Sequence, residues 1–98
     1  MKGLKIDQKQ LNRLVEKIQK GDEESFGKIY DSYVDSIYRY VFLKIGSKEK
    51  TEEIVQDVFL KFWRFVREKE NKVKNVNAFL YTIAKSLIAD YYRAAEKR

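Results

Sequence analysis

The chain has 98 residues, no cysteine, no histidine, no proline and a formal net charge of +6. This length suits one domain, and the two missing residue types exclude disulfides, thiolate nucleophiles, imidazole bases and the usual zinc sites. The positive charge favours nucleic acid or an anionic membrane surface as partner, although many small soluble domains are equally basic.

The N-terminal end shows no targeting signal. Lys5, Asp7 and Lys9 interrupt any apolar run that a signal peptide would need, and residues 1–6 are expected to be disordered. No stretch of the sequence approaches the ~18 consecutive apolar residues of a membrane span. Together with the absence of cysteine, this indicates a cytoplasmic protein that does not span a membrane. Since core packing leaves over no lipid-facing apolar stripe, we expect no membrane partner either.

Two helices are predicted in the first half of the chain. Asp7 and Gln10 resemble a capping box, and the helix that follows should end at Gly21. Asp22 then caps a long second helix that ends at Gly46. The predicted buried stripes are Leu11, Leu14, Val15 and Ile18 in the first helix, and Phe26, Ile29, Tyr30, Tyr33, Ile37, Tyr38, Val41, Phe42 and Ile45 in the second.

The segment 51–66 predicts the central helix, with Thr51 as its N-cap and a short connection that makes it antiparallel to the second helix. Its stripe is Ile54, Val55, Val58, Phe59, Phe62, Trp63 and Val66. The opposite face carries Leu60 among Glu53, Gln56, Asp57 and Arg64. An isolated exposed leucine means little, but one surrounded by polar side chains is also typical of the centre of a docking patch.

Periodicity stops from Arg67 to Asn77, and residues 61–77 hold six basic and two acidic side chains. This segment is either a solvated loop or part of a nucleic-acid surface. Asn75 or Asn77 can cap a last helix, whose predicted buried stripe is Phe79, Leu80, Ile83, Ala84, Leu87, Ile88 and Tyr91. The chain stops at Arg98 on a charged helix end, which suggests a fragment of something longer. We therefore expect an all-α, compact bundle of about four helices, forming one domain over residues 1–98.

The sequence contains no pattern that supports an enzyme. The paired carboxylates lie at helix N-termini, where the helix dipole explains them, and no phosphate loop, metal spacing or nucleophile–base pair occurs. We expect no enzyme, no metal and no cofactor.

A nucleic-acid surface has more support. Aromatic residues alternate with basic ones in the last third of the chain, which suits single-stranded DNA because bases stack on rings while cations meet phosphates. The alternative is that the aromatic side chains are core and the charges merely keep the protein in solution. The residues concerned are Arg64, Arg67, Lys69, Lys72, Lys74, Lys85 and Arg93, with Phe65, Phe79, Tyr81 and Tyr92.

Three segments, in order and at compatible spacing, resemble region 2 of bacterial RNA polymerase sigma factors of the extracytoplasmic-function group. They are Gly-Asp-Glu-Glu-Ser-Phe at 21–26 with Ile29, Tyr30 and Tyr33; Glu-Ile-Val-Gln-Asp-Val-Phe at 53–59 with Phe62 and Trp63; and Ala-Phe-Leu-Tyr-Thr-Ile-Ala at 78–84 with Ile88, Ala89 and Asp90. The resemblance covers about residues 8–95 and implies a fold of packed helices.

The resemblance implies two surfaces. The Val-Gln-Asp helix would grip the clamp helices of the largest subunit of the polymerase core, which by position assigns polymerase binding to Glu53, Gln56, Asp57 and Leu60. The 67–77 loop and last helix would open the promoter minus-ten element and capture an extruded base of the non-template strand. Phosphate contacts would fall to Arg67, Lys72, Lys74, Lys85 and Arg93, and a base pocket to Asn75, Asn77 and Ser86.

The sequence departs from the family pattern at several positions. Many relatives have Asn at the Ser86 position, Trp at the Phe79 position and an aromatic residue near Lys69 or Glu70. A second DNA-binding domain, for the minus-thirty-five element, is absent from this sequence. The resulting expectation is a sigma factor domain for promoter recognition and melting, whose partners are polymerase, promoter DNA and an anti-sigma factor. The alternative is a sigma-like interaction bundle that binds polymerase or an anti-sigma factor without reading DNA.

Overall fold

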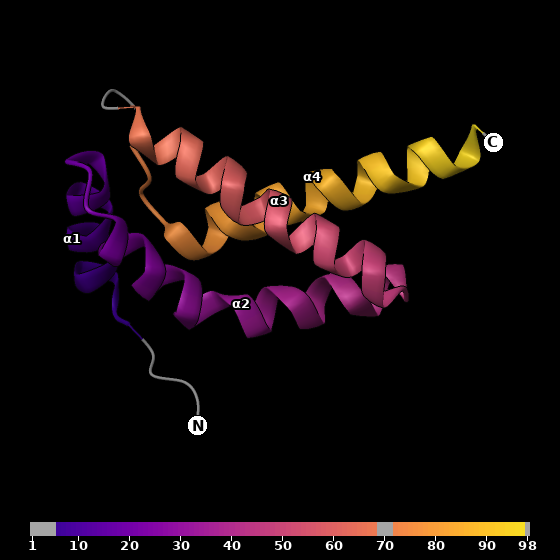
Figure 1. Cartoon of the computed structure of the whole chain (residues 1–98), viewed down its shortest axis with the longest axis horizontal. Coiled ribbons are helices and arrows are strands. Elements are labelled where there is room, and N and C mark those ends of the chain that lie inside the picture. The colour runs from indigo at the N-terminus through magenta and orange to yellow at the C-terminus, as the bar shows by residue number, and fades with distance from the viewer. Residues whose placement is uncertain (1–5, 69–71, 98) are drawn as a thin grey trace.

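The computed structural model describes residues 6–68 and 72–97 and shows four helices (Figure 1). They are α1 (Gln8–Gln19), α2 (Glu23–Ile45), α3 (Lys48–Arg67) and α4 (Val76–Glu96). The described residues contain no strand, which confirms the predicted all-α bundle. Residues 1–5 of the segment expected to be disordered lie outside the described part, whereas Ile6 is half-buried and packs against the core.

The predicted caps of the first two helices are confirmed. Asp7 accepts a hydrogen bond from the Gln10 amide at 2.9 Å, and the Gln10 side chain accepts one from the Asp7 amide at 3.2 Å. Asp22 caps α2 by accepting from the Glu24 amide at 3.1 Å. Gly21 follows α1 with φ of 97°, a conformation that other residues rarely adopt.

The start of the central helix differs from its prediction. Ser47, not Thr51, is the N-cap, and it accepts a hydrogen bond from the Lys50 amide at 3.2 Å. Gly46, with φ of 78°, ends α2 directly before it, so only two residues turn the chain. Because α3 begins one turn earlier, Thr51 is fully buried, and its hydroxyl oxygen has no hydrogen-bond partner.

The N-cap of α4 is Asn75, one of the two predicted alternatives. Its side chain accepts a hydrogen bond from the Ala78 amide at 3.0 Å. Val76 directly after it is fully buried and fixes the entry of the helix into the core. Asn77 is therefore an exposed residue of the first helical turn.

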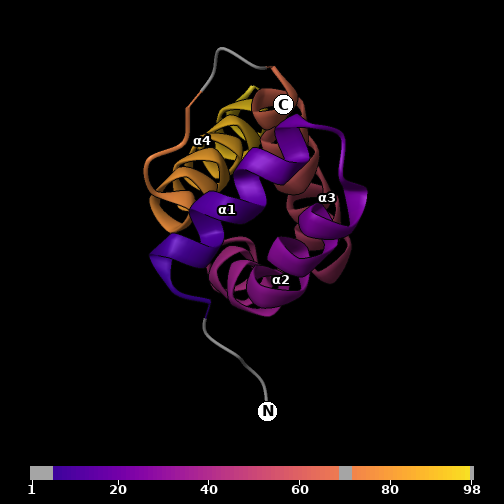
Figure 2. The same cartoon turned by 90° about the vertical axis from the view of Figure 1, so that its left-hand side faces the viewer.

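The four helices enclose one hydrophobic core. α3 runs back across α2, α4 packs against both, and α1 lies across one end of the bundle (Figure 1; Figure 2). Each large apolar side chain removed from water stabilises the fold by roughly 1.5–3 kcal/mol. The fully buried members include Ile18, Ile29, Ile37, Val41, Val58, Phe62, Val66, Val76, Leu80 and Ala84.

A row of aromatic rings passes through this core from one side of α3 to the other. Trp63 meets Phe26 edge-on with centroids 5.0 Å apart, and Phe26 stacks near Phe62 at 6.3 Å. Phe62 contacts Phe79 at 6.0 Å, and Phe79 contacts Phe65 at 4.8 Å. Rings at these separations attract one another beyond the area that they bury.

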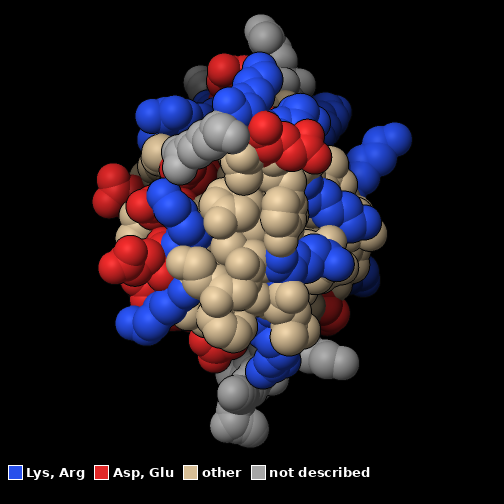
Figure 3. All heavy atoms as spheres, turned by 90° about the vertical axis from the view of Figure 1, so that its right-hand side faces the viewer, with Lys and Arg blue, Asp and Glu red and all other residues tan. Residues whose placement is uncertain are grey.

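The predicted stripe of α2 is wider than the surface that the other helices cover. Tyr30 and Phe42 were expected to be buried but are 37% and 39% exposed. Leu43 in the last turn of α2 is 77% exposed. Figure 3 faces the end of the molecule where α4 terminates, and shows uncharged surface bordered by lysine and arginine.

Candidate functional site

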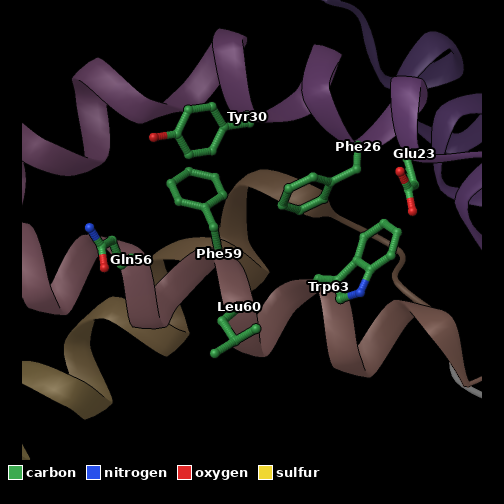
Figure 4. A pocket seen from close by; sticks show the side chains of 7 residues that line it. All are labelled: Glu23, Phe26, Tyr30, Gln56, Phe59, Leu60 and Trp63. Atoms are coloured by element: carbon green, nitrogen blue, oxygen red, sulfur yellow. The ribbon is translucent and has the colours of Figure 1, made fainter.

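An apolar groove of about 420 Å³ lies between α2 and α3. Figure 4 shows its aromatic walls: Tyr30 of α2 packs against Phe59 of α3, and Phe26 lies next to Trp63. The Tyr30 and Phe59 ring centroids are 4.8 Å apart. The full lining consists of Glu23, Phe26, Tyr30, Gln56, Phe59, Leu60 and Trp63. Pockets with apolar walls and a few polar groups at the edge are typical binding sites.

The four residues expected to bind polymerase are all exposed, and they share one face of α3. Gln56 and Leu60 line the groove itself, and Leu60 is 44% exposed. Glu53 forms a solvent-exposed ion pair with Lys50 at 3.7 Å, a contact that another partner can replace at little cost. The structure therefore joins part of the predicted docking face to a groove.

Most groove residues were missed as site residues. The apolar stripes of the sequence predict core positions for four of them, namely Phe26, Tyr30, Phe59 and Trp63. Phe59 is indeed buried, but Trp63 and Phe26 are half-buried and Tyr30 is exposed. An unusually broad aromatic stripe on α2 was the available signal, but the sequence does not show how much of it α3 covers.

Arg67 was expected to contact DNA phosphates, but it lies on the groove side of α3. It follows Leu60 by seven residues, or nearly two helical turns, so the two side chains share a face. Its guanidinium carbon lies 5.2 Å from the centre of the Trp63 ring, in the range of a cation–π contact.

A second surface lies on the far side of α3, where Phe65 and Phe79 are half-buried against each other. Ser86 and Arg93 follow Phe79 at intervals of seven residues and continue the same side of α4, both exposed. Arg93 pairs with Asp90 through a hydrogen-bonded ion pair on the surface. Lys85 is also exposed, one position around the helix from Ser86.

Helical geometry separates two members of the expected base pocket. Asn77 and Ser86 are nine residues apart in the continuous helix α4, so they point to opposite sides and stand about 13 Å apart along its axis. Asn77 shares its side with Tyr81, which meets Tyr40 of α2 edge-on at 5.2 Å. The Asn75 side chain serves as the helix cap. Ser86 thus lies on the Phe79 side of α4, about 10 Å along the axis from Phe79, and not on the side of Asn77.

Lys72 and Lys74 are exposed on the segment that leads into α4. Together with Asn12, Val15, Glu16, Gln19 and Val73, they line a polar cleft of about 390 Å³ between this segment and α1. Lys69 of the basic set lies outside the described residues.

Among the described residues, no group of three or more Asp or Glu side chains is placed to hold a metal ion. Burial, and secondarily the neighbouring Tyr81, raises the pKa of Tyr33, so its phenol stays neutral at physiological pH. None of the helices in the described residues combines the length and the hydrophobicity of a membrane span.

Comparison with known proteins gives concordant matches. The model of the family described as Sigma-70 region 2 matches residues 29–98. The chain is 33% identical over 92 residues to the ECF RNA polymerase sigma factor BldN of Streptomyces coelicolor, which covers 94% of this chain and 35% of that protein. It is 28% identical over 83 residues to the ECF RNA polymerase sigma factor SigW of Bacillus subtilis, covering 85% and 44%. The chain thus spans less than half the length of these curated relatives.

A solved structure supports the fold independently. A chain of the RsbN–BldN complex superposes with a TM-score of 0.71 and 36% identity, covering 83% of this chain and 59% of that chain. The relatives are named as sigma factors, not as enzymes.

Proposed function

The chain belongs to the sigma-70 region 2 family, and on that premise we propose that it docks on the polymerase clamp helices and reads the promoter minus-ten element. Its relatives are sigma factors of the extracytoplasmic-function group, so its place is in transcription initiation. It would act where polymerase acts, in the bacterial cytoplasm, as one domain of a larger factor.

The observation that carries the docking proposal is the aromatic groove between α2 and α3. A coiled-coil partner presents a row of apolar side chains with polar flanks. The groove would accept such a side chain against the accessible faces of Tyr30 and Trp63. Leu60 then contacts the partner from the edge of the groove, and Gln56 and Asp57 supply polar contacts around it.

The DNA proposal is supported by the second surface. An unstacked base would lie on the Phe65–Phe79 pair with its edge near Ser86, which contributes a hydroxyl donor and acceptor. Phosphates on either side would meet Lys72, Lys74, Lys85 and, after it leaves Asp90, Arg93. With Arg67 on the groove side, we remove it from the phosphate contacts and assign it to docking.

A second candidate function is protein binding alone. In this case the domain binds polymerase or an anti-sigma protein through the groove and does not read DNA bases. The specific observation in its favour is that a similar chain was solved in the complex of BldN with another protein, RsbN.

Two titrations on the same purified domain separate these functions. The first uses a fragment with the clamp helices of the polymerase largest subunit, and the second uses single-stranded non-template oligonucleotides varied one base at a time. We expect Asp57→Lys to weaken only the first. Lys72→Ala and Lys74→Ala should weaken every oligonucleotide alike and reduce the salt dependence, by about 0.7 in log–log slope per lost contact.

A matched pair of variants tests whether the domain reads bases. Ser86→Ala should change base preference at one position, because Ser86 is a polar side chain two turns along α4 on the Phe79 side. Asn77→Ala, on the opposite side of α4, should not. Clamp binding combined with oligonucleotide binding that ignores base identity at every position would select the interaction bundle.

A further inference from the structure

A long-range hydrogen bond of Gln8 joins helix α1 to the segment that leads into α4. The side-chain amide nitrogen of Gln8 donates one hydrogen bond to the backbone carbonyl of Lys74 at 3.1 Å and another to the Asn12 side-chain oxygen at 2.9 Å. The Lys74 bond joins residues 66 positions apart in the sequence. Figure 2 shows α1 lying across the end of the bundle, with its N-terminal end near the start of α4.

Both sides of this bond are anchored independently of it. The capping box of Asp7 and Gln10 fixes the start of α1, and its four buried side chains hold it on the core. On the other side, Asn75 caps α4, Val76 is fully buried and Val73 packs against the core. The exposed Lys74 lies between the packed Val73 and the helix cap Asn75, and Gln8 holds its carbonyl.

We propose that Gln8 is a positioning residue for single-stranded DNA, which holds the Lys74 carbonyl so that Lys72 and Lys74 are presented to the strand before it arrives. The inference rests on the DNA-binding part of the proposed function. It extends that function to α1, which lies before the residues that the family model matches.

The physical reason is preorganisation. An exposed segment that is free to move must be ordered when DNA binds, and the lost conformational freedom is subtracted from the affinity. A hydrogen bond from a packed helix orders the segment in advance. Since one such bond has a modest net value, its loss should weaken oligonucleotide binding by about two- to tenfold.

The matched variants come from α1 itself. Gln8→Ala removes the amide, and Gln8→Glu replaces the donor with a carboxylate that cannot donate to a carbonyl. Glutamate in the first turn favours the helix, so Gln8→Glu should melt no lower than the wild type. Gln10→Glu adds the same charge two residues away, keeps the capping box and lines a different pocket, which makes it the control for charge.

The experiment titrates the wild type and the three variants with non-template oligonucleotides at two salt concentrations. It also measures backbone order parameters of residues 72–75 by 15N relaxation without DNA. We expect both Gln8 variants to bind more weakly than Gln10→Glu, with lower order parameters at Lys74 and its neighbours and an unchanged melting temperature for Gln8→Glu. A purely structural role for Gln8 would move the melting temperature and not the order parameters of this segment.

Failure of the inference differs from failure of the proposed function. If the wild type binds oligonucleotides without base preference, the DNA-reading function falls. If the wild type reads bases and the Gln8 variants match Gln10→Glu in affinity and in the order parameters of residues 72–75, the positioning role is overturned while the function stands.

Discussion

The substitution Leu60→Asp tests the docking groove, and Leu43→Asp provides its matched control. Both leucines are exposed helical residues, at 44% and 77%. Leu60 lines the groove, whereas Leu43 lies in the last turn of α2 and is not part of the groove lining. The two variants carry the same chemical change, so a difference in partner binding reports position alone.

The magnitude follows from the area that Leu60 still exposes. Its exposed fraction corresponds to roughly 75 Å², which at about 25 cal/mol per Å² gives an apolar contribution of up to about 2 kcal/mol on docking. This converts to a loss of about 30-fold in affinity. The new carboxylate also stands between Gln56 and Arg64 on a face that already carries Glu53 and Asp57, so the loss should be no smaller if the partner surface is apolar.

The assay is isothermal titration calorimetry against the clamp-helix fragment, accompanied by thermal melting of each variant. Because both side chains point away from the core, each variant should lose no more than about 1 kcal/mol of folding stability. Equal affinities of Leu60→Asp and Leu43→Asp would refute the assignment of the groove as the docking site. A loss of more than about 3 kcal/mol of stability in Leu60→Asp alone would show that Leu60 belongs to the core.

Three further predictions concern stability. Thr51→Val removes a buried hydroxyl without a partner, so the melting temperature should rise, by an amount corresponding to about 1 kcal/mol; a lower melting temperature would show that the hydroxyl does have a partner. Trp63→Ala should cost about 2–3 kcal/mol in urea unfolding, less than a fully buried aromatic, because the Trp63 side chain is only half-buried. The Ser25 hydroxyl, and secondarily backbone amides, lower the pKa of Asp22 below its ordinary value. The contribution of Asp22 to stability is therefore present at neutral pH and is lost as the pH falls through this lowered pKa, so that Asp22→Asn should flatten the pH dependence of melting between about pH 5 and pH 2.

The helices and most of their caps could be predicted because their signals are local. Asp7, Asp22 and Gly46 each act within one turn of their own helix, and the structure confirms all three. Thr51 shows where local reasoning stops. Ser47 and Thr51 are both good caps, and the Lys-Glu-Lys between them has no apolar residue to show that the helix has already begun.

The surfaces depend on how the helices cross, which no local pattern contains. Tyr30 falls on an apolar stripe, yet it lines an open groove because α3 crosses α2 and leaves it partly uncovered. Asn77 and Ser86 could have been separated from the sequence alone, since nine residues place them on opposite sides of any continuous helix. The contact from Gln8 to Lys74 joins residues too far apart in sequence for any periodic pattern to reveal.

The position of Trp63 gives the domain a built-in optical reporter. It is the only tryptophan of the chain, so its emission can be excited selectively at wavelengths where the seven tyrosines hardly absorb. Its indole is half-buried at the groove, with the Arg67 guanidinium over the ring. A partner that enters the groove removes water from this indole and displaces or fixes that cation, and both events change the wavelength and intensity of emission. Occupancy of the groove can thus be followed in the unlabelled wild-type protein, in real time and beside any DNA that does not touch this side of α3.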